Sequence, residues 1–110
     1  MKSRLLTTTK TRTGRWRWNI HPGEILREDF LKPLKLTSYR LAKELHVPAP
    51  RINDVVLEKR GITADTAVRL ARYFGNSAEF WMNAQAFYDV RRAAGKLARE
   101  LKRIEPRKVA

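Results

Sequence analysis

The feature that most constrains the fold is the spacing of apolar residues between Pro22 and Ile104. These residues recur every three or four positions, and helix-breaking residues interrupt the pattern at short intervals. Such spacing places apolar side chains on one face of a helix, whereas a half-buried strand would alternate apolar and polar residues. No alternating pattern competes within this stretch. The sequence therefore predicts an all-α domain built from several short helices.

Five helices are expected, because residues that favour a helix start or end lie at five pairs of positions. The predicted helices are Pro22 to a stop at Pro33, Ser38 to Leu45 after the N-cap Thr37, Ala49 or Pro50 to Leu57, Thr63 to Gly75, and a last helix capped by Ser77. The residues expected to face the core are Ile25, Leu26, Phe30, Leu31, Tyr39, Leu41, Ala42, Leu45, Ile52, Val55, Val56, Ala64, Ala67, Leu70, Ala71, Phe74, Phe80, Trp81, Ala84, Phe87 and Tyr88.

The chain is strongly basic, with 24 Lys and Arg residues against 11 Asp and Glu and a net charge of +13. Residues 1–20 hold six basic and no acidic residues, and residues 91–110 hold eight basic and two acidic ones. The stretch between them holds ten basic and nine acidic residues. A cationic excess favours an anionic partner, most commonly nucleic acid. Because the central stretch is nearly neutral, specific recognition must depend on a few well-placed side chains.

Other classes of protein are disfavoured by what the sequence lacks. There is no cysteine, so neither a disulfide framework nor a thiolate metal site is expected. No apolar run approaches the roughly 18 residues of a membrane span, and no apolar core of a secretory signal follows the first residues. We therefore expect a cytoplasmic bacterial protein, associated with the nucleoid and not with a membrane.

The folded domain is expected to span residues 21–91, between two basic ends. Residues 1–20 are rich in Thr and Arg with little apolar periodicity, which predicts a flexible arm. Within the arm Trp16 and Trp18 alternate with arginines. This alternation fits a short strand, an aromatic and basic patch, or two rings that pack on the neighbouring domain.

The second basic end, residues 92–110, is expected to be helical to about Ile104. Its apolar residues continue the spacing of four and three that is typical of a coiled-coil seam, for about two heptads. The candidate dimer contacts are Phe87, Val90, Ala94, Leu97 and Leu101. The alternative is a helix that packs on its own domain or frays.

Residues 38–57 have the pattern of a helix-turn-helix, with two short helices joined across a break at residues 46–49. Such a pair can place the second helix, the recognition helix, in the major groove of DNA. The outward residues of this helix are the base-reading candidates Ala49, Pro50, Arg51, Asn53 and Asp54. The flanking residues Thr37, Ser38, Arg40, Lys43, Lys59 and Arg60 are the candidates for phosphate contacts, which would set the register.

The base-reading candidates differ in what they recognise. Arg51 suits guanine, because a guanidinium group can donate to O6 and N7 together. Asn53 suits adenine or a phosphate, and Asp54 either accepts from cytosine or orients Arg51. Ala49 and Pro50 suit the methyl group of thymine.

Several short motifs occur together between His21 and Arg91, which is about two thirds of the chain. They are HPGEIL, YRLAKEL in the second helix, RIN in the recognition helix, KRGITADTAVRLAR and FWMNAQAFYDV. In this combination the stretch resembles the HigA antitoxins, a branch of the Cro/repressor-type (XRE) helix-turn-helix family. Each motif alone would be a weak signal, and the set is specific.

The resemblance implies a five-helix, lambda-repressor-like fold that forms a homodimer through its C-terminal part. It implies two partners, double-stranded operator DNA and a small RelE-like toxin that cleaves mRNA and is encoded beside the antitoxin. In such a type II toxin-antitoxin module, similar to HigBA, the antitoxin neutralises the toxin by binding it and represses their shared operon. The sequence departs from the family at Pro50, where a polar residue is usual. The operator sequences of relatives therefore do not predict the operator of this protein. The two basic ends also lie outside the shared pattern.

Two other functions fit the same residues. One is a stand-alone XRE-type transcriptional regulator without a toxin partner, and the other is a structural or RNA-binding protein that uses the basic ends. An enzyme is disfavoured, because no set of nucleophile, base and orienting residue is evident. His21 and His46 lack the spacing of metal ligands. No metal and no cofactor are therefore expected.

Overall fold

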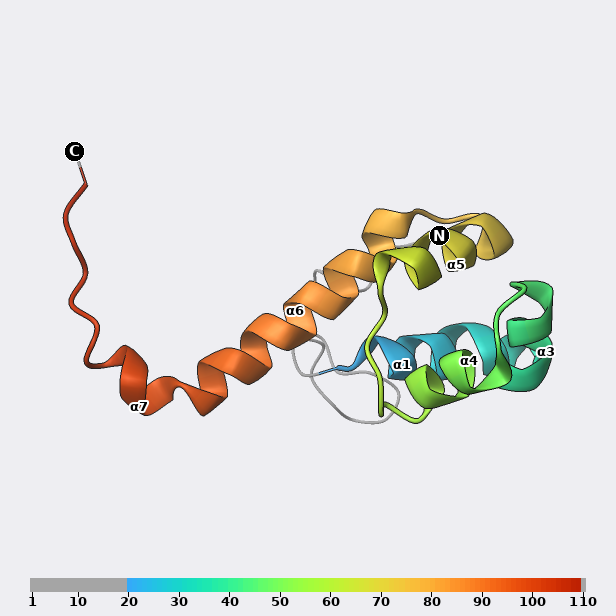
Figure 1. Ribbon diagram of the computed structural model, residues 1–110, viewed down its shortest axis with the longest axis horizontal. Coiled ribbons are helices and arrows are strands. Elements are labelled where there is room, and N and C mark those ends of the chain that lie inside the picture. The colour runs from blue at the N-terminus through green and yellow to red at the C-terminus, as the bar shows by residue number, and fades with distance from the viewer. Residues whose placement is uncertain (1–19, 110) are drawn as a thin grey trace.

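The computed structural model describes residues 20–109, and within that range it contains helices and no strand (Figure 1). Short helices form a domain, and one long helix extends away from it toward the C-terminus. The prediction of an all-α fold is confirmed. The expectations for residues 1–19 of the arm, including those for Trp16 and Trp18, concern residues outside the described range. Ile20, which was expected to be the last residue of the arm, is buried in the core. None of the described helices combines the length and the apolar character needed to cross a bilayer.

The first helix starts where the sequence predicts. It is formed by α1 (Pro22–Ile25), the π-helical segment η2 (Leu26–Leu31) and α2 (Lys32–Leu34), which follow one another without a break. His21 caps it, since its Nδ1 accepts a hydrogen bond from the Gly23 N–H at 2.8 Å. The cap satisfies one of the backbone donors that a helix start leaves unpaired.

The prediction that Pro33 stops this helix is wrong. At the end of η2 the turn is widened, and the Lys32 N–H donates to the carbonyl of Arg27, five residues back. Pro33 follows directly as the second residue of α2, and a proline is tolerated where a widened turn already interrupts the regular α-helical hydrogen bonds. The helix ends two residues later, where Lys35 adopts a left-handed conformation with a φ of 53°.

The remaining helices of the domain are α3 (Ser38–Glu44), α4 (Ala49–Val56), α5 (Ala64–Phe74) and α6 (Ala78–Lys96). Three of them, α3, α5 and α6, start at the predicted caps, and α4 starts at Ala49, one of the two predicted starts. The hydroxyl groups of Thr37, Thr63 and Ser77 each accept a hydrogen bond from the backbone N–H three residues further on. Gly75 ends α5 with a φ of 73°, the conformation that favours glycine at this position. These four boundary predictions are confirmed.

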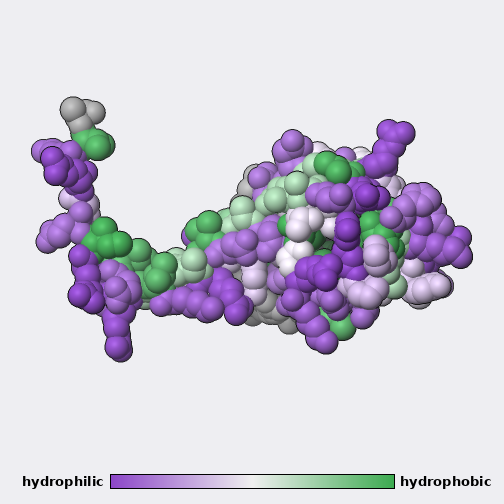
Figure 2. Space-filling model, viewed as in Figure 1, coloured by the Kyte–Doolittle hydropathy of each residue, from purple (hydrophilic) through white to green (hydrophobic). Residues whose placement is uncertain are grey.

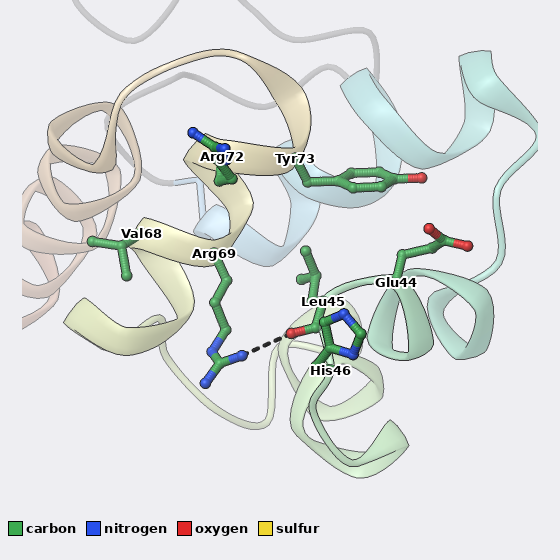
Figure 3. Close-up of a pocket in the computed structure, with 7 residues that line it drawn as sticks. All are labelled: Glu44, Leu45, His46, Val68, Arg69, Arg72 and Tyr73. Carbon is green, nitrogen blue, oxygen red and sulfur yellow. Dashed lines mark hydrogen bonds between the residues drawn. The ribbon is translucent and has the colours of Figure 1, made fainter.

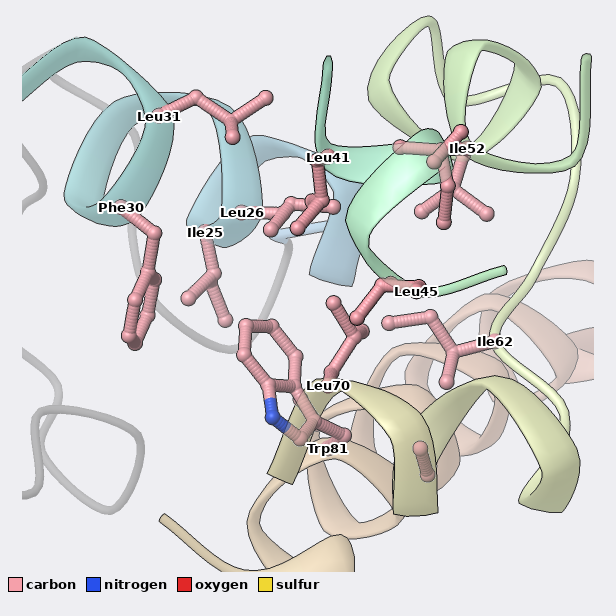
Figure 4. Close-up of a cluster of buried hydrophobic side chains, with 14 of the residues drawn as sticks. Ile25, Leu26, Phe30, Leu31, Leu41, Leu45, Ile52, Ile62, Leu70 and Trp81 are labelled. Carbon is pink, nitrogen blue, oxygen red and sulfur yellow. The ribbon is translucent and has the colours of Figure 1, made fainter. Parts of the chain in front are cut away.

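The core lies between these helices, and Trp81 of α6 is its largest fully buried side chain (Figure 4). The indole N–H of Trp81 donates to Asn76 Oδ1 at 3.0 Å, so its polar edge is satisfied. Aliphatic side chains from every other helix of the domain are buried with it, including Leu26, Leu41, Ile52 and Leu70. The apolar pattern therefore predicts most of the core correctly.

Two core predictions are wrong. Tyr39 precedes Leu41 by two residues, about 200° around the helix. It consequently lies on the outer side of α3, and 68% of its surface is exposed. Ala64 is exposed at the start of α5, whereas Thr66, which was not predicted to be in the core, is buried.

The first helix supports α4 through an unusually close approach. A Cβ atom on Gly23 would overlap the backbone carbonyl of Val55, so only glycine fits at this position. One turn further on, Arg27 Nη1 donates to the carbonyl of Val56 at 2.6 Å, at the C-terminal end of α4. Arg27 Nη2 also contacts Glu58 at 3.3 Å. These contacts fix the position of α4 relative to the rest of the domain.

The C-terminal extension projects from the domain as the second half of α6 and the short α7 (Ala98–Leu101), and every residue from Asp89 to Val109 is exposed (Figure 1). The prediction of one helix to about Ile104 is wrong, because the helix breaks at Leu97. Gly95 lowers helix propensity just before the break, and an unsupported helix is marginally stable. Apolar side chains gather on this extension (Figure 2).

Among the candidate dimer contacts, Val90, Leu97 and Leu101 are 58%, 47% and 45% exposed, and Ala94 is exposed as well. Phe87 is partly buried, with the guanidinium of Arg91 4.8 Å from its ring centre. Within the described residues the seam therefore does not pack on its own domain, which was one of the alternatives.

Replacing Gly23 with Ala should destabilise the domain by about 1–3 kcal/mol, because the added methyl group forces α1 and α4 apart. Urea unfolding followed by circular dichroism measures this free energy. Gly95→Ala is the matched control, since a Cβ there meets nothing within 4 Å. The control should leave the stability unchanged or raise it by up to about 1 kcal/mol. Equal stability of the Gly23→Ala protein and the wild type would show that the close approach is not a constraint.

Candidate nucleic-acid interface

The turn between α3 and α4 is tight and well satisfied. His46 adopts a left-handed conformation with a φ of 61°, and its N–H donates to the Lys43 carbonyl at 3.2 Å. The Val47 N–H donates to the Ala42 carbonyl at 3.0 Å. Pro48 is extended and is the N-cap residue of α4. The break that the sequence predicts here is therefore the turn of a helix-turn-helix.

The buried faces of α3 and α4 determine which residues point outward. Leu41 and Leu45 of α3 are buried, as are Ile52 and Val55 of α4. The first two turns of α4 consequently present their other side to solvent. Three base-reading candidates share that side, with Pro50 and Asn53 exposed and Ala49 partly buried.

These three residues border a hollow of about 440 Å³ between the start of α3 and the start of α4. The other residues that line it are Ser38, Tyr39 and Asp54. The Ser38 hydroxyl donates to Asn53 Oδ1 at 3.3 Å, which leaves the amide nitrogen of Asn53 able to donate outward. The structure therefore brings together four of the five base-reading candidates and one phosphate candidate.

Tyr39 is a member of this group that sequence reasoning missed. It was assigned to the core because it is aromatic, yet its phenol lies beside the exposed start of α4. The signal was present in the sequence, since the stripe formed by Leu41, Ala42 and Leu45 excludes the position two residues earlier.

Arg51 is separated from the other base-reading candidates and contacts a different helix. Its Nη1 donates to Asp65 Oδ1 at 2.7 Å, and its side chain is 33% exposed. A second hollow of about 250 Å³ lies between these residues and the loop that carries Arg60 and Gly61. Asp54, which was expected to accept from cytosine or to orient Arg51, instead forms an ion pair with Arg60, at 3.8 Å. Asp65 was not predicted as the partner of Arg51, because it lies 14 residues further along the chain.

Asp65 is held by two cations. Arg69 Nε donates to the same oxygen, Oδ1, at 2.7 Å. This hydrogen bond, together with the charges of Arg69 and Arg51, lowers the pKa of Asp65 below its usual value despite partial desolvation, which acts in the opposite direction. Asp65 is therefore ionised at neutral pH.

Some phosphate candidates precede α4 in the chain and the others follow it. Lys43 and Lys59 are exposed and form no ion pair within the described part of the chain. Arg40 is 65% exposed and contacts Glu44 at 2.9 Å, one turn further along α3. Thr37 uses its oxygen as the cap of α3, and its hydroxyl proton remains able to donate.

A third hollow, of about 310 Å³, lies between the end of α3 and α5 (Figure 3). Val68 and Tyr73 line it with exposed apolar surface, and Arg72 lies beside them. Arg69 crosses the hollow and donates through Nη1 to the Leu45 carbonyl at 2.8 Å. Among the residues described, no cluster of His, Cys, Asp and Glu could hold a metal ion.

Comparisons with known proteins agree with this geometry. A helix-turn-helix family model matches residues 28–81. The chain is 61% identical over 74 residues to virulence-associated protein I of Dichelobacter nodosus, an alignment that covers 67% of this chain and 68% of that protein. It is 32% identical over 87 residues to antitoxin HigA-1 of Vibrio cholerae, covering 79% of this chain and 82% of that protein.

A solved structure supports the same conclusion. The Pseudomonas aeruginosa antitoxin HigA, determined with the higBA promoter, matches with a TM-score of 0.78 and 48% sequence identity. The match covers 80% of this chain and 97% of that one. The domain is therefore similar to that protein in both fold and sequence.

Proposed function

The chain belongs to the HigA antitoxin family of helix-turn-helix proteins, and we propose that it represses its own operon and neutralises a toxin encoded beside it. The family consists of DNA-binding antitoxins and transcription regulators, not of enzymes. The observation that carries the proposal for this chain is the exposed start of α4, with cationic side chains on both sides of it.

In the proposed complex α4 enters the major groove. Ala49, Pro50, Arg51, Asn53 and Asp54 contact base edges, and Tyr39 joins them because it lines the same hollow. The phosphate contacts come from Thr37, Ser38, Arg40, Lys43, Lys59 and Arg60. The hydroxyl and cationic groups in this set suit phosphate oxygens, which fix the register without carrying sequence information.

We propose that two copies bind together, through the apolar seam of α6 and α7. The seam is exposed on a helix that projects from the domain, so a second copy can reach it without rearrangement (Figures 1 and 2). A two-fold dimer would place its two recognition helices about 34 Å apart, in successive turns of the major groove. The operator is then a pseudo-palindrome.

The toxin partner is proposed from family membership. The co-encoded protein is a small RelE-like ribonuclease that the antitoxin binds and inactivates. The alternative is a stand-alone regulator with the same fold and no toxin. The positive charge of residues 1–20 and 92–110 suits both DNA and an acidic protein surface, so either partner could use it.

Arg51→Ala and Lys43→Ala should weaken DNA binding in different ways. Loss of Arg51 should cost about 1–3 kcal/mol on the operator and little on random DNA, because it removes a base contact. Loss of Lys43 should weaken both complexes similarly and lower the salt slope by about 0.9 for each bound copy, because each copy loses one phosphate contact. Fluorescence anisotropy on both DNAs at several salt concentrations measures these effects. A similar loss on both DNAs for Arg51→Ala would contradict base reading.

The paired change Leu97→Gln and Leu101→Gln should shift the protein from a dimer toward a single chain of 12.8 kDa. Each leucine contributes apolar area to the proposed seam, so the dimer should weaken at least about tenfold. Sedimentation equilibrium measures the change. Arg99→Gln, on the opposite side of α7, is the control and should keep the dimer. A dimer that survives the paired change would place the interface elsewhere.

Co-expression with the adjacent open reading frame should restore growth that this reading frame alone prevents, and the two proteins should co-purify. The Arg51→Ala protein should also restore growth, because neutralisation requires toxin binding and not base reading. Normal growth without the chain, together with no complex, would support the stand-alone regulator.

A further inference from the structure

Asp65 connects the recognition helix to α5 in a way that the proposed function does not explain. A single oxygen, Oδ1, accepts hydrogen bonds from Arg51 Nη1 and from Arg69 Nε, each at 2.7 Å. Asp65 lies at the second position of α5, so its side chain extends from a helix start that Thr63 fixes. Arg51 is the third residue of α4, in its first turn. The carboxylate therefore bridges two helices that meet the proposed DNA surface.

The position of this carboxylate is itself determined by the turn of the helix-turn-helix. Arg69 Nη1 donates to the Leu45 carbonyl at 2.8 Å, at the end of α3 (Figure 3). The same guanidinium group holds Asp65 through Nε. A continuous series of contacts thus runs from the turn through Arg69 and Asp65 to Arg51, and it includes all three helices around the recognition surface.

The contact with Asp65 leaves the useful edge of Arg51 available. A guanidinium group binds guanine most specifically with two parallel donors, directed at O6 and N7. Asp65 occupies Nη1, so the edge formed by Nε and Nη2 remains for this contact. An arginine that is already held by a carboxylate loses less side-chain entropy when it binds than a freely rotating one.

We propose that Asp65 is a specificity-determining positioning residue, which holds the guanidinium of Arg51 so that its free edge is presented to a guanine in the major groove. The inference rests on the proposed function, because it assigns Arg51 to base reading. Asp65 itself contacts no base. The opposite role for Asp65 would be competition with DNA for Arg51, and the two roles predict opposite effects of removing the carboxylate.

The test uses the full chain and double-stranded DNA from upstream of its gene. A footprint of the wild-type protein defines the site, and each base pair in it is then replaced in turn. The base pair whose replacement matters for the wild type and not for Arg51→Ala is the one that Arg51 reads. The discrimination measured at that base pair is the readout, because a general loss of stability would lower affinity for all sequences alike.

Asp65→Ala should reduce the discrimination at that base pair by about 2-fold to 10-fold, the lower part of the range expected for two coupled neighbours. Affinity for random DNA should stay the same or rise, because a negative charge is removed from the surface that faces phosphates. In the Arg51→Ala background the same change should have no further effect on discrimination. Glu79→Ala is the matched control, since Glu79 is the acidic residue at the second position of α6. It should change none of these quantities.

Asp65→Asn keeps the shape of the side chain and removes its charge, so it replaces Asp65→Ala if that protein does not fold. Unchanged discrimination in the folded variant would refute the positioning role. Higher operator affinity with full discrimination would also refute it, in favour of competition. If the wild type gives no footprint, the proposed function itself is wrong. If it gives a footprint, and discrimination depends on Arg51 but does not change in the Asp65 variant, only the present inference is wrong.

Discussion

The recognition surface depends on the close packing of the first helix against α4. Gly23 allows the backbone of α1 to approach the Val55 carbonyl, and Arg27 binds the carbonyl of Val56 at the end of the same helix. These contacts hold α4 from its buried side, while Pro50 and Asn53 at its start are exposed. The support of the helix and the surface that would meet DNA therefore lie on opposite sides of α4.

In the proposed function, the domain reads DNA and the C-terminal extension forms the dimer contact. The central stretch is nearly neutral, and several of its cations, among them Arg40, Lys43, Lys59 and Arg60, lie on the elements that flank α4 in the chain. The extension is basic, and its exposed apolar residues include Val90 in α6, Leu97 between α6 and α7, and Leu101 in α7. This separation lets the proposed dimer contact form at a distance from the surface that reads DNA.

The sequence predicts local features well and long-range contacts poorly. The caps Thr37, Thr63 and Ser77 act on backbone groups within three residues, so their effect is visible in the chain itself. The failure at Pro33 has a different cause, since a widened π turn depends on how the whole first helix packs. The pairing of Arg51 with Asp65, and not with Asp54, joins two helices across a loop, and only the folded structure brings those groups together.

Methylation interference on the operator tests the central claim, that α4 reads bases from the major groove. Dimethyl sulfate modifies guanine N7 in the major groove and adenine N3 in the minor groove. The account predicts that N7 methylation blocks binding at two clusters of guanines, about one helical turn apart. Interference at adenine N3 alone, with every guanine tolerated, would place the protein in the minor groove and contradict the account.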